Sequence, residues 1–282
     1  MKQERIILVV GLGLIGGSVC MALRGFEQYR IIGADCAEET RRWAQEHDVC
    51  DAVADRVEEV LPQADVVVLA MHPKGITEQL LRWKALFRPG TLVTDVGGIK
   101  GVVMESARAL PEGVDFIGWH PMAGKETSGI QNAEGTLFRN AHFIITPGEH
   151  STPEHQDLLW RMGQYMGFRD LIVTTPEEHD RIIAYTSQLM HIIAVSTCDD
   201  DTLFRCRGFE GGSFRGCTRV AALDVGLWTD LFTQNAPALC DSIRQLEEHL
   251  HAYREVLEAG DTDRLAEMLS ASAERKRKMK LE

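Results

Sequence analysis

A glycine-rich turn near the start of the chain has the residue spacing that binds the phosphates of a dinucleotide. The apolar run Ile6–Val10 leads directly into Gly-Leu-Gly-Leu-Ile-Gly at residues 11–16, and a helical pattern follows. Gly11 permits the tight turn, Gly13 lets a pyrophosphate approach the backbone, and Gly16 allows the helix to pack closely against the strand. The pyrophosphate would then rest on amides at the helix N-terminus. A strand before the motif and a helix after it make this pattern far more specific than the glycines alone.

An acidic residue follows the second apolar run and points to the cofactor. Asp35 comes directly after residues 30–34, where its carboxylate can accept hydrogen bonds from ribose hydroxyls and would repel a 2′-phosphate. The sequence therefore predicts NAD rather than NADP. An aspartate that only closes a turn is the alternative, and Arg41 and Arg42 on the next helix could offset the repulsion. The residues expected to contact the cofactor are Gly11, Gly13, Leu14, Ile15, Gly16, Asp35 and Asp95.

Two further segments place reactive or small residues at the ends of predicted strands, where an open parallel sheet binds its ligand. Residues 94–100 pass from a strand into a helix, and Gly97 and Gly98 would let a nicotinamide or a substrate lie close to the backbone. His120, in Gly-Trp-His-Pro-Met-Ala-Gly at 118–124, comes just past a strand end. An imidazole there can accept the proton that a hydroxyl gives up when it is oxidised by hydride transfer. A histidine satisfied by backbone hydrogen bonds is the alternative.

A third segment carries polar residues at helical spacing. Asp180, Ala184, Ser187 and His191 follow one another at intervals of four, three and four residues, so a regular helix would present them on one face. This stripe could line a cleft. A buried polar face whose groups are already hydrogen-bonded is the alternative.

The elements that must position these residues alternate along the first part of the chain. Short apolar runs separated by amphipathic stretches predict a doubly wound α/β fold of the Rossmann type, with a parallel sheet covered by helices on both faces. After Pro176 only helical patterns follow, which predicts a dinucleotide-binding domain at 1–175 and an all-helical domain at 176–282. The predicted strands are residues 6–10, 30–34, 66–70, 92–95, 115–118, 142–146 and 171–174.

Within the helical half, residues 204–218 are rich in glycine and arginine and predict a flexible basic loop. A narrow apolar seam comes later, and it requires a partner helix from the same domain or from a second subunit. Gly260 then ends that helix, and Asp261 or Asp263 can begin the last one. The residues of the seam are Leu239, Ile243, Leu246, Leu250, Tyr253 and Leu257.

Composition narrows the classes of protein that fit. The chain has 282 residues, of which 44% are hydrophobic and 26% charged, and this is ordinary globular usage. A formal net charge of -12 disfavours nucleic acid and anionic membranes as partners but leaves room for an anionic small molecule in a local basic pocket. Seven cysteines without a Cys-x-x-Cys pair indicate neither a disulfide framework nor a metal site. Glycines interrupt the apolar N-terminal run, so a signal peptide is not expected and the cytoplasm is the predicted location.

Together, these motifs resemble those of the prephenate and arogenate dehydrogenases, and the resemblance extends over essentially the whole chain. Its most specific part is His-Pro-Met-Ala-Gly at residues 120–124. The other matching segments are residues 11–18, 95–100, Ser128-Gly129, His179-Asp180 with Ser187 and His191, 211–214, and Thr218-Arg219.

The resemblance implies roles for individual residues. In this family the histidine of the His-Pro-Met-Ala-Gly run hydrogen-bonds the C4 hydroxyl of the substrate and acts as the base, which gives that role to His120. The arginine of the Thr-Arg segment binds a substrate carboxylate, so Arg219 would hold that group through two hydrogen bonds. Catalytic positions fall on Ser187 and His191 as well, and substrate-site positions fall on Gly98 and Gln188. The implied reaction is the NAD-dependent oxidative decarboxylation of prephenate in tyrosine biosynthesis, by a homodimer formed through the helical domain.

The chain departs from the family pattern at three positions and leaves other functions open. Gly98 stands where many members have a serine, Gln188 replaces a histidine, and Gly216 replaces an aspartate. Arogenate is the alternative substrate. A different two-domain hydroxyacid dehydrogenase would generally use a lysine at the start of the helical domain, where this chain has Asp180, Ser187 and His191 instead. An NAD-binding sensor without activity is the third alternative.

Overall fold

The computed structural model describes residues 4–125 and 127–279. The chain forms two compact units, which divide between Asn235 and Ala236. The first unit is built on one eight-stranded sheet with the strand order β3-β2-β1-β4-β5-β6-β7-β8. Its strands are β1 Ile6–Val10, β2 Arg30–Ala34, β3 Ala52–Ala54, β4 Val66–Leu69, β5 Leu92–Asp95, β6 Asp115–Pro121, β7 His142–Pro147 and β8 Asp170–Val173.

All seven predicted strands are present, and the doubly wound Rossmann-type sheet is confirmed, with two differences. The edge strand β3 was missed, because its apolar stretch is only three residues long and only half-buried. The predicted parallel sheet contains one antiparallel pair, which β7 forms with β6. The connection between these strands contains only the short helical turn Ile130–Asn132. Without a crossover helix to carry the chain back to its starting edge, β7 runs in the return direction.

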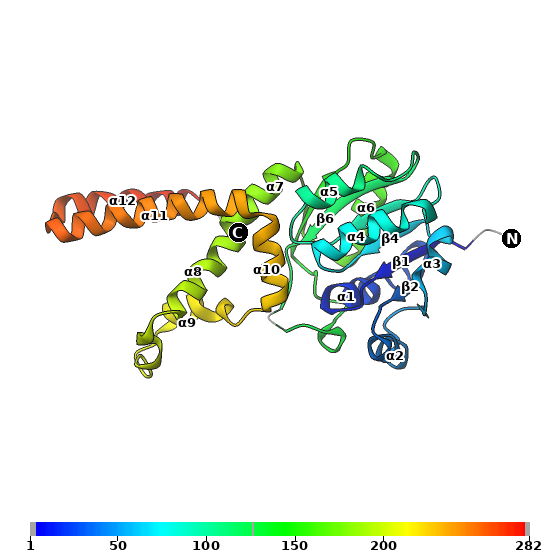
Figure 1. The fold of residues 1–282 in the computed structure, drawn as a ribbon, viewed down its shortest axis with the longest axis horizontal. Helices are drawn as coiled ribbons and strands as arrows, with labels where there is room; N and C mark the ends of the chain where they lie inside the picture. The colour runs from blue at the N-terminus through cyan, green and yellow to red at the C-terminus, as the bar shows by residue number, and fades with distance from the viewer. Residues whose placement is uncertain (1–3, 126, 280–282) are drawn as a thin grey trace. The chain divides into compact units, whose positions relative to one another are not determined.

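Helices cover both faces of the sheet (Figure 1). The α-helices of the first unit are α1 Leu14–Leu23, α2 Glu38–Glu46, α3 Val57–Val60, α4 Pro73–Trp83, α5 Gly101–Ala107, α6 Pro153–Met166, α7 Pro176–Ile183, α8 Leu189–Cys198, α9 Gly212–Thr218 and α10 Val225–Gln234. Shorter 3-10 turns lie at Phe26–Gln28, Leu61–Gln63, Lys84–Leu86, Ile130–Asn132, Asp201–Phe204 and Arg219–Ala221, and a π-helical turn lies at Ala184–Gln188.

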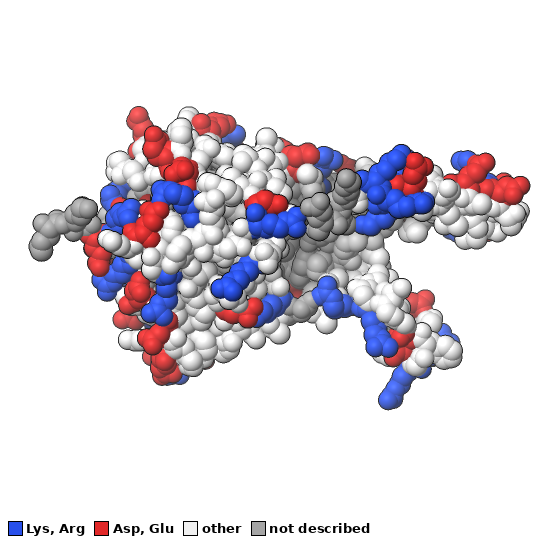
Figure 2. Space-filling model, turned by 180° about the vertical axis from the view of Figure 1, so that it is seen from behind, with Lys and Arg blue, Asp and Glu red and all other residues white. Residues whose placement is uncertain are grey.

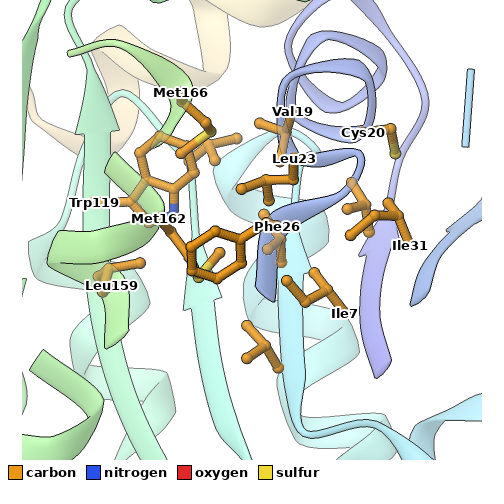
Figure 3. Packing of buried hydrophobic residues seen from close by; sticks show 14 of the residues in the cluster. Ile7, Val19, Cys20, Leu23, Phe26, Ile31, Trp119, Leu159, Met162 and Met166 are labelled. Carbon is orange, nitrogen blue, oxygen red and sulfur yellow. The ribbon is translucent and has the colours of Figure 1, made fainter. Parts of the chain in front are cut away.

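Alternate residues of the central strand β1 bury themselves in two different hydrophobic layers. Ile7 and Val9 pack with side chains of α1 and α6. Figure 3 shows part of this layer, in which Ile7 of β1, Leu23 of α1 and Met162 of α6 are labelled among the packed side chains. The other residues of β1 face the opposite layer, formed with α4 and α5. A strand that is apolar on both sides must be covered on both sides, which is why the sheet is doubly wound.

From Pro176 to Met279 the structure contains helices and no strand. The flexible loop expected at 204–218 was wrong in part, because residues Gly212–Thr218 form α9. The predicted domain boundary near residue 175 falls inside the first compact unit, since α7 and α10 are hydrogen-bonded to the segments beside α5 and α4. The domain boundary at 175 stays a prediction.

The second unit consists of α11 Ala236–Ala259 and α12 Thr262–Lys278, which pack against each other. As predicted, the chain turns at Gly260, which has a left-handed φ of 65°, and Asp261 caps α12 by accepting a hydrogen bond from the amide of Arg264. The predicted apolar seam lies on α11. Leu250 and Leu257 of this seam remain 59% and 62% exposed, so α12 covers only part of it.

Acidic and basic side chains are interspersed over the face of the molecule that Figure 2 shows. Many of them form exposed ion pairs, such as Arg108 with Glu105 at 2.6 Å. Such pairs contribute little to stability, because water screens them. In residues 4–125 and 127–279, no helix combines the length and the apolar character that crossing a bilayer requires.

One ion pair is different because it is completely buried. The Lys100 ammonium lies 2.6 Å from Asp95 Oδ2 at the end of β5, and neither side chain is exposed. Gly118 on β6 makes room for it, since a Cβ there would lie 2.9 Å from Lys100 Cδ. Burial raises the pKa of Asp95 and lowers the pKa of Lys100, and in each case the partner charge opposes the shift.

We expect the substitution Asp95→Asn to lower the free energy of unfolding by about 3–5 kcal/mol, because it leaves a buried ammonium without its counter-charge. The matched control is Glu105→Gln, which breaks the exposed pair with Arg108 and should change that free energy by about 1 kcal/mol or less. Denaturant unfolding measures both. Equal losses in the two variants would contradict the assigned importance of the buried pair.

Candidate active site

A pocket of about 630 Å³ opens at the carboxyl ends of β1, β4, β5 and β6. It lies where the strand order turns, beside the junction of β1 and β4, which is where doubly wound sheets bind their ligands. Helical segments between Ile183 and Leu231 complete its walls. Nine of the predicted site residues line this single pocket: Gly13, Leu14, Ile15, Gly98, His120, Ser187, Gln188, His191 and Arg219.

The three motif glycines serve two different purposes. Gly11 has a left-handed φ of 95°, and a Cβ there would lie 2.3 Å from the carbonyl oxygen of Ala70. A Cβ on Gly16 would lie 1.8 Å from the carbonyl oxygen of Gly11, so both residues make close packing possible. A Cβ on Gly13 would meet nothing within 4 Å, because this glycine faces the pocket. The open space beside Gly13 and the N-terminus of α1 fits a pyrophosphate.

Asp35 lies beyond the end of β2 and orders the glycine turn. Its Oδ2 accepts a hydrogen bond from the amide of Leu12 at 2.7 Å, and its Oδ1 accepts one from Ala37 at 2.9 Å. Each carboxylate oxygen keeps a second lone pair for a ribose hydroxyl. Arg41 is engaged elsewhere: it donates to the carbonyl oxygen of Asp35 and pairs with Asp55 at 3.5 Å. The Arg41 guanidinium is thus occupied by Asp35 and Asp55, which leaves it less suited to bind a 2′-phosphate.

His120 lies within β6, which was expected to end at residue 118 and ends at Pro121, and its backbone pairs with Ile144 of β7. Its Nδ1 is 3.0 Å from Nε2 of His179 on α7. Burial lowers the pKa of His120 well below its ordinary value of 6.5, and the neighbouring His179 and Lys100 act in the same direction. A neutral imidazole that lines a pocket is suited to accept a proton.

The predicted polar stripe on α7 and α8 is interrupted by the π-helical turn Ala184–Gln188, which changes the helical register. Ser187 and His191 line the pocket, whereas Asp180 turns away to the start of α5 and Ala184 is fully buried. Nδ1 of His191 donates to the carbonyl oxygen of Ser187 at 2.9 Å. The imidazole also stacks on the Trp228 ring, with 3.6 Å between the ring centroids. Burial lowers the pKa of His191.

Gln188 lines the pocket and Asp95 does not, and both side chains have partners within the protein. The side-chain amide of Gln188 donates to the carbonyl oxygen of Leu231 at 3.1 Å and accepts from Asn235 at 2.8 Å, and the residue is 1% exposed. Asp95 is fully buried with Lys100 and does not line the pocket. The direct contacts predicted for Gln188 and Asp95 stay predictions, and in the structure both side chains hold elements together.

Arg219 follows the last residue of α9 and lines the same pocket as His120 and Gly13. A guanidinium at this place can bind a carboxylate through two hydrogen bonds. The pocket therefore combines a phosphate-binding turn, a neutral imidazole and a cation, which suits hydride transfer from an anionic alcohol.

Sequence reasoning missed three contributors to the site. His179 contacts His120 across 59 residues of sequence, and the one available signal was its place beside Asp180 in a matching segment. Residues 70–73 line the pocket directly after β4, as expected of a strand next to the turn in strand order. Trp228 and Leu231 of α10 also line it, and nothing in their spacing distinguished them from core residues.

Comparison with known proteins gives consistent results over the whole chain. The sequence model of the prephenate dehydrogenase nucleotide-binding domain matches residues 20–169, and that of the dimerization domain matches residues 175–271. A prephenate dehydrogenase of Lactococcus lactis is 33% identical over 86% of this chain and 69% of its own.

Two solved structures are also similar. The prephenate dehydrogenase of Aquifex aeolicus, crystallised with hydroxyphenyl propionate and NAD+, has a TM-score of 0.88 and 26% identity, covering 98% of this chain and 99% of its own. The arogenate dehydrogenase of Synechocystis has a TM-score of 0.83 and 28% identity, covering 97% and 99%. These matches confirm the predicted resemblance, and the chain belongs to the prephenate dehydrogenase family.

Proposed function

We propose that this protein catalyses the NAD-dependent oxidative decarboxylation of prephenate to 4-hydroxyphenylpyruvate, a step of tyrosine biosynthesis. The observation that carries the proposal is that Gly13, His120 and Arg219 line one pocket. Membership of the prephenate dehydrogenase family supports the same reaction. The dinucleotide is held by Gly11, Gly13, Leu14, Ile15, Gly16 and Asp35. Asp95 supports the cofactor side of the pocket from the core, because it accepts hydrogen bonds from the Gly97 amide and the Lys100 ammonium.

When bound, NAD would supply the acceptor for the hydride of the carbinol carbon. His120 takes the hydroxyl proton, so the carbon–oxygen bond becomes a carbonyl. The bond between the ring and its carboxylate then breaks, carbon dioxide leaves, and the electron pair moves through the ring to that oxygen. The resulting phenolate recovers the proton from His120. Aromatisation favours the second step, and the protein contributes position and an unprotonated base.

The substrate is held from the helical side of the pocket. Arg219 binds a carboxylate and so orients the ring relative to the cofactor. Ser187 and His191 act in the same wall, where Trp228 fixes the imidazole by stacking. Gly98 leaves space for the ring beside Leu231, and Gln188 supports that wall through its hydrogen bonds with α10.

The active protein is a homodimer in this proposal, with a dinucleotide-binding domain at 1–175 and a helical substrate and dimerisation domain at 176–282. Two observations support the dimer: the dimerization-domain model matches residues 175–271, and the seam on α11 keeps Leu250 and Leu257 exposed. A cytoplasmic location and a small-molecule substrate fit this enzyme.

The purified protein tests the reaction directly. With NAD and prephenate it should generate NADH absorbance together with 4-hydroxyphenylpyruvate. Parallel assays with arogenate and with NADP give kcat/KM for each pair and identify the preferred substrate and cofactor. A protein that binds NAD but turns over neither acid would instead be a sensor, and the proposal would be wrong.

We expect His120→Ala to lower kcat by about 10²- to 10⁴-fold, because the variant has lost the group that takes the hydroxyl proton. NAD affinity, measured by the quenching of protein fluorescence, should be retained. The matched control is His150→Ala, in an exposed turn after β7, which should keep full turnover. A His120→Ala protein with unchanged kcat would remove the proposed mechanism.

For Arg219→Ala, the expected result is a rise in the KM for prephenate that corresponds to roughly 2–5 kcal/mol, as when one partner of a charge pair is lost. Arg219→Lys should lie between this variant and the wild type, since it keeps the charge but not the two-pronged geometry. The control is Arg215→Ala on α9, whose guanidinium bonds to the carbonyl oxygen of Glu210. A normal KM in Arg219→Ala would assign the carboxylate to another residue.

The acid limb of the pH profile should reflect the lowered pKa of His120. Protonation removes the base, so kcat/KM is fully present above this pKa and is lost as the pH falls through it. Because burial holds the pKa well below 6.5, we expect kcat/KM for prephenate to stay level from neutral pH to below 6.5 and then to decline. An acid limb with its midpoint at or above 6.5 would contradict this assignment.

A further inference from the structure

His120 is the first member of a hydrogen-bonded chain that runs away from the pocket. Its Nδ1 lies 3.0 Å from Nε2 of His179, and Nδ1 of His179 lies 2.7 Å from Oδ1 of Asp180. His179 is only 2% exposed, so water has little access to either bond. Each of these two bonds therefore needs one proton, supplied by one of the groups in the chain.

The Asp180 carboxylate determines which nitrogen carries each proton. Its Oδ1 accepts the amide of Lys100 and its Oδ2 accepts the amide of Gly101, both at 2.7 Å. A carboxylate held by two amide donors accepts from the imidazole as well, so Nδ1 of His179 carries a proton. A neutral imidazole has only one N–H. Nε2 of His179 is then bare and accepts the Nδ1 proton of His120.

Charge and burial favour the neutral form of His120. The buried ammonium of Lys100 acts on His120, and a second buried cation beside it would be unfavourable. Residue 98 is a glycine and has no side chain that could hold the His120 ring. It packs against Leu231, whose Cδ2 would lie 3.3 Å from a Cβ at position 98. Orientation of the His120 ring therefore comes from the α7 side, through His179.

We propose that His179 and Asp180 are positioning residues that keep the proton of neutral His120 on Nδ1, so that its bare Nε2 faces the reaction. This inference rests on the proposed role of His120 as the base and specifies which atom performs it. When the substrate O–H bond breaks, an N–H bond forms at Nε2, and the imidazolium then donates from Nδ1 to His179. The negative charge of Asp180 stabilises that state, and the phenolate later takes the proton back from Nε2. No proton needs to pass to Asp180.

Nitrogen NMR of the full-length protein with ¹⁵N-labelled histidine tests the tautomer without any turnover. His120 is assigned by the resonance that disappears in His120→Asn, at a pH where the ring is neutral. We expect a pyrrole-type resonance for Nδ1 and a pyridine-type resonance for Nε2. The opposite pattern, with the proton on Nε2, would overturn the proposal even if His120→Ala is inactive. Conversely, an active His120→Ala would remove the proposed base while leaving the tautomer measurement valid.

Two variants of His179 separate positioning from mere packing. His179→Leu removes the acceptor, so kcat should fall by about 10²-fold or more, as when a catalytic histidine loses its correct tautomer, while the KM values change by a few-fold at most. His179→Gln places an amide oxygen where Nε2 was and should restore kcat to within about tenfold of the wild type. Equal kcat in the two variants, or wild-type kcat in His179→Leu, would overturn the proposal.

The matched control is His155→Leu. His155 forms a similar pair with the buried carboxylate of Asp115, at 2.6 Å, away from the pocket. Its loss should lower stability without lowering kcat. If His179→Leu does not fold, the glutamine variant and the tautomer of the wild-type protein still decide the question.

Discussion

The Asp180 carboxylate connects the helical part of the first unit to the sheet, and the geometry of the pocket depends on this connection. It accepts the amides of Lys100 and Gly101 at the start of α5, together with Nδ1 of His179. The backbone carbonyl oxygen of Asp180 accepts a hydrogen bond from the side-chain amide of Asn235. A single side chain thus holds α7 against the segment that follows β5 and orders the imidazole of His179, which contacts His120. Bonds to a charged acceptor are among the stronger hydrogen bonds in proteins.

Burial is the second constraint, and it acts on the same group of residues. Lys100 and Asp95 form an ion pair with no solvent exposure directly beneath the pocket. Such a pair is a poor source of stability by itself, because desolvation opposes the attraction between the charges. It does place a fixed positive charge near His120, and together with burial this keeps the imidazole neutral. The interior of the sheet therefore keeps the proposed base unprotonated.

Gln188 is an example of a predicted substrate contact whose side chain connects two helical segments. Gln188 lies on a π-helical turn, where the family resemblance led us to expect a substrate contact. Its amide instead bonds to Leu231 and Asn235. These two bonds join α10 and its C-cap residue to the segment that carries Ser187. Gln188 thus stabilises the part of the pocket wall that lies beside Gly98. A π-turn inserts one residue into the helix, and this explains why a regular helical spacing misplaced Asp180 and Ala184.

Local patterns in the sequence determined the seven main strands, the glycine turn and the candidate base, because each depends on neighbouring residues. Ile6–Val10 is apolar on both sides, which by itself requires helices on both faces of the sheet. What remained hidden depends on contacts between distant segments. The direction of β7, the pairing of His120 with His179 and the partners of Gln188 all join residues far apart in sequence. Such pairings are settled by which groups must be hydrogen-bonded once they are buried, and only the tertiary structure shows which groups those are.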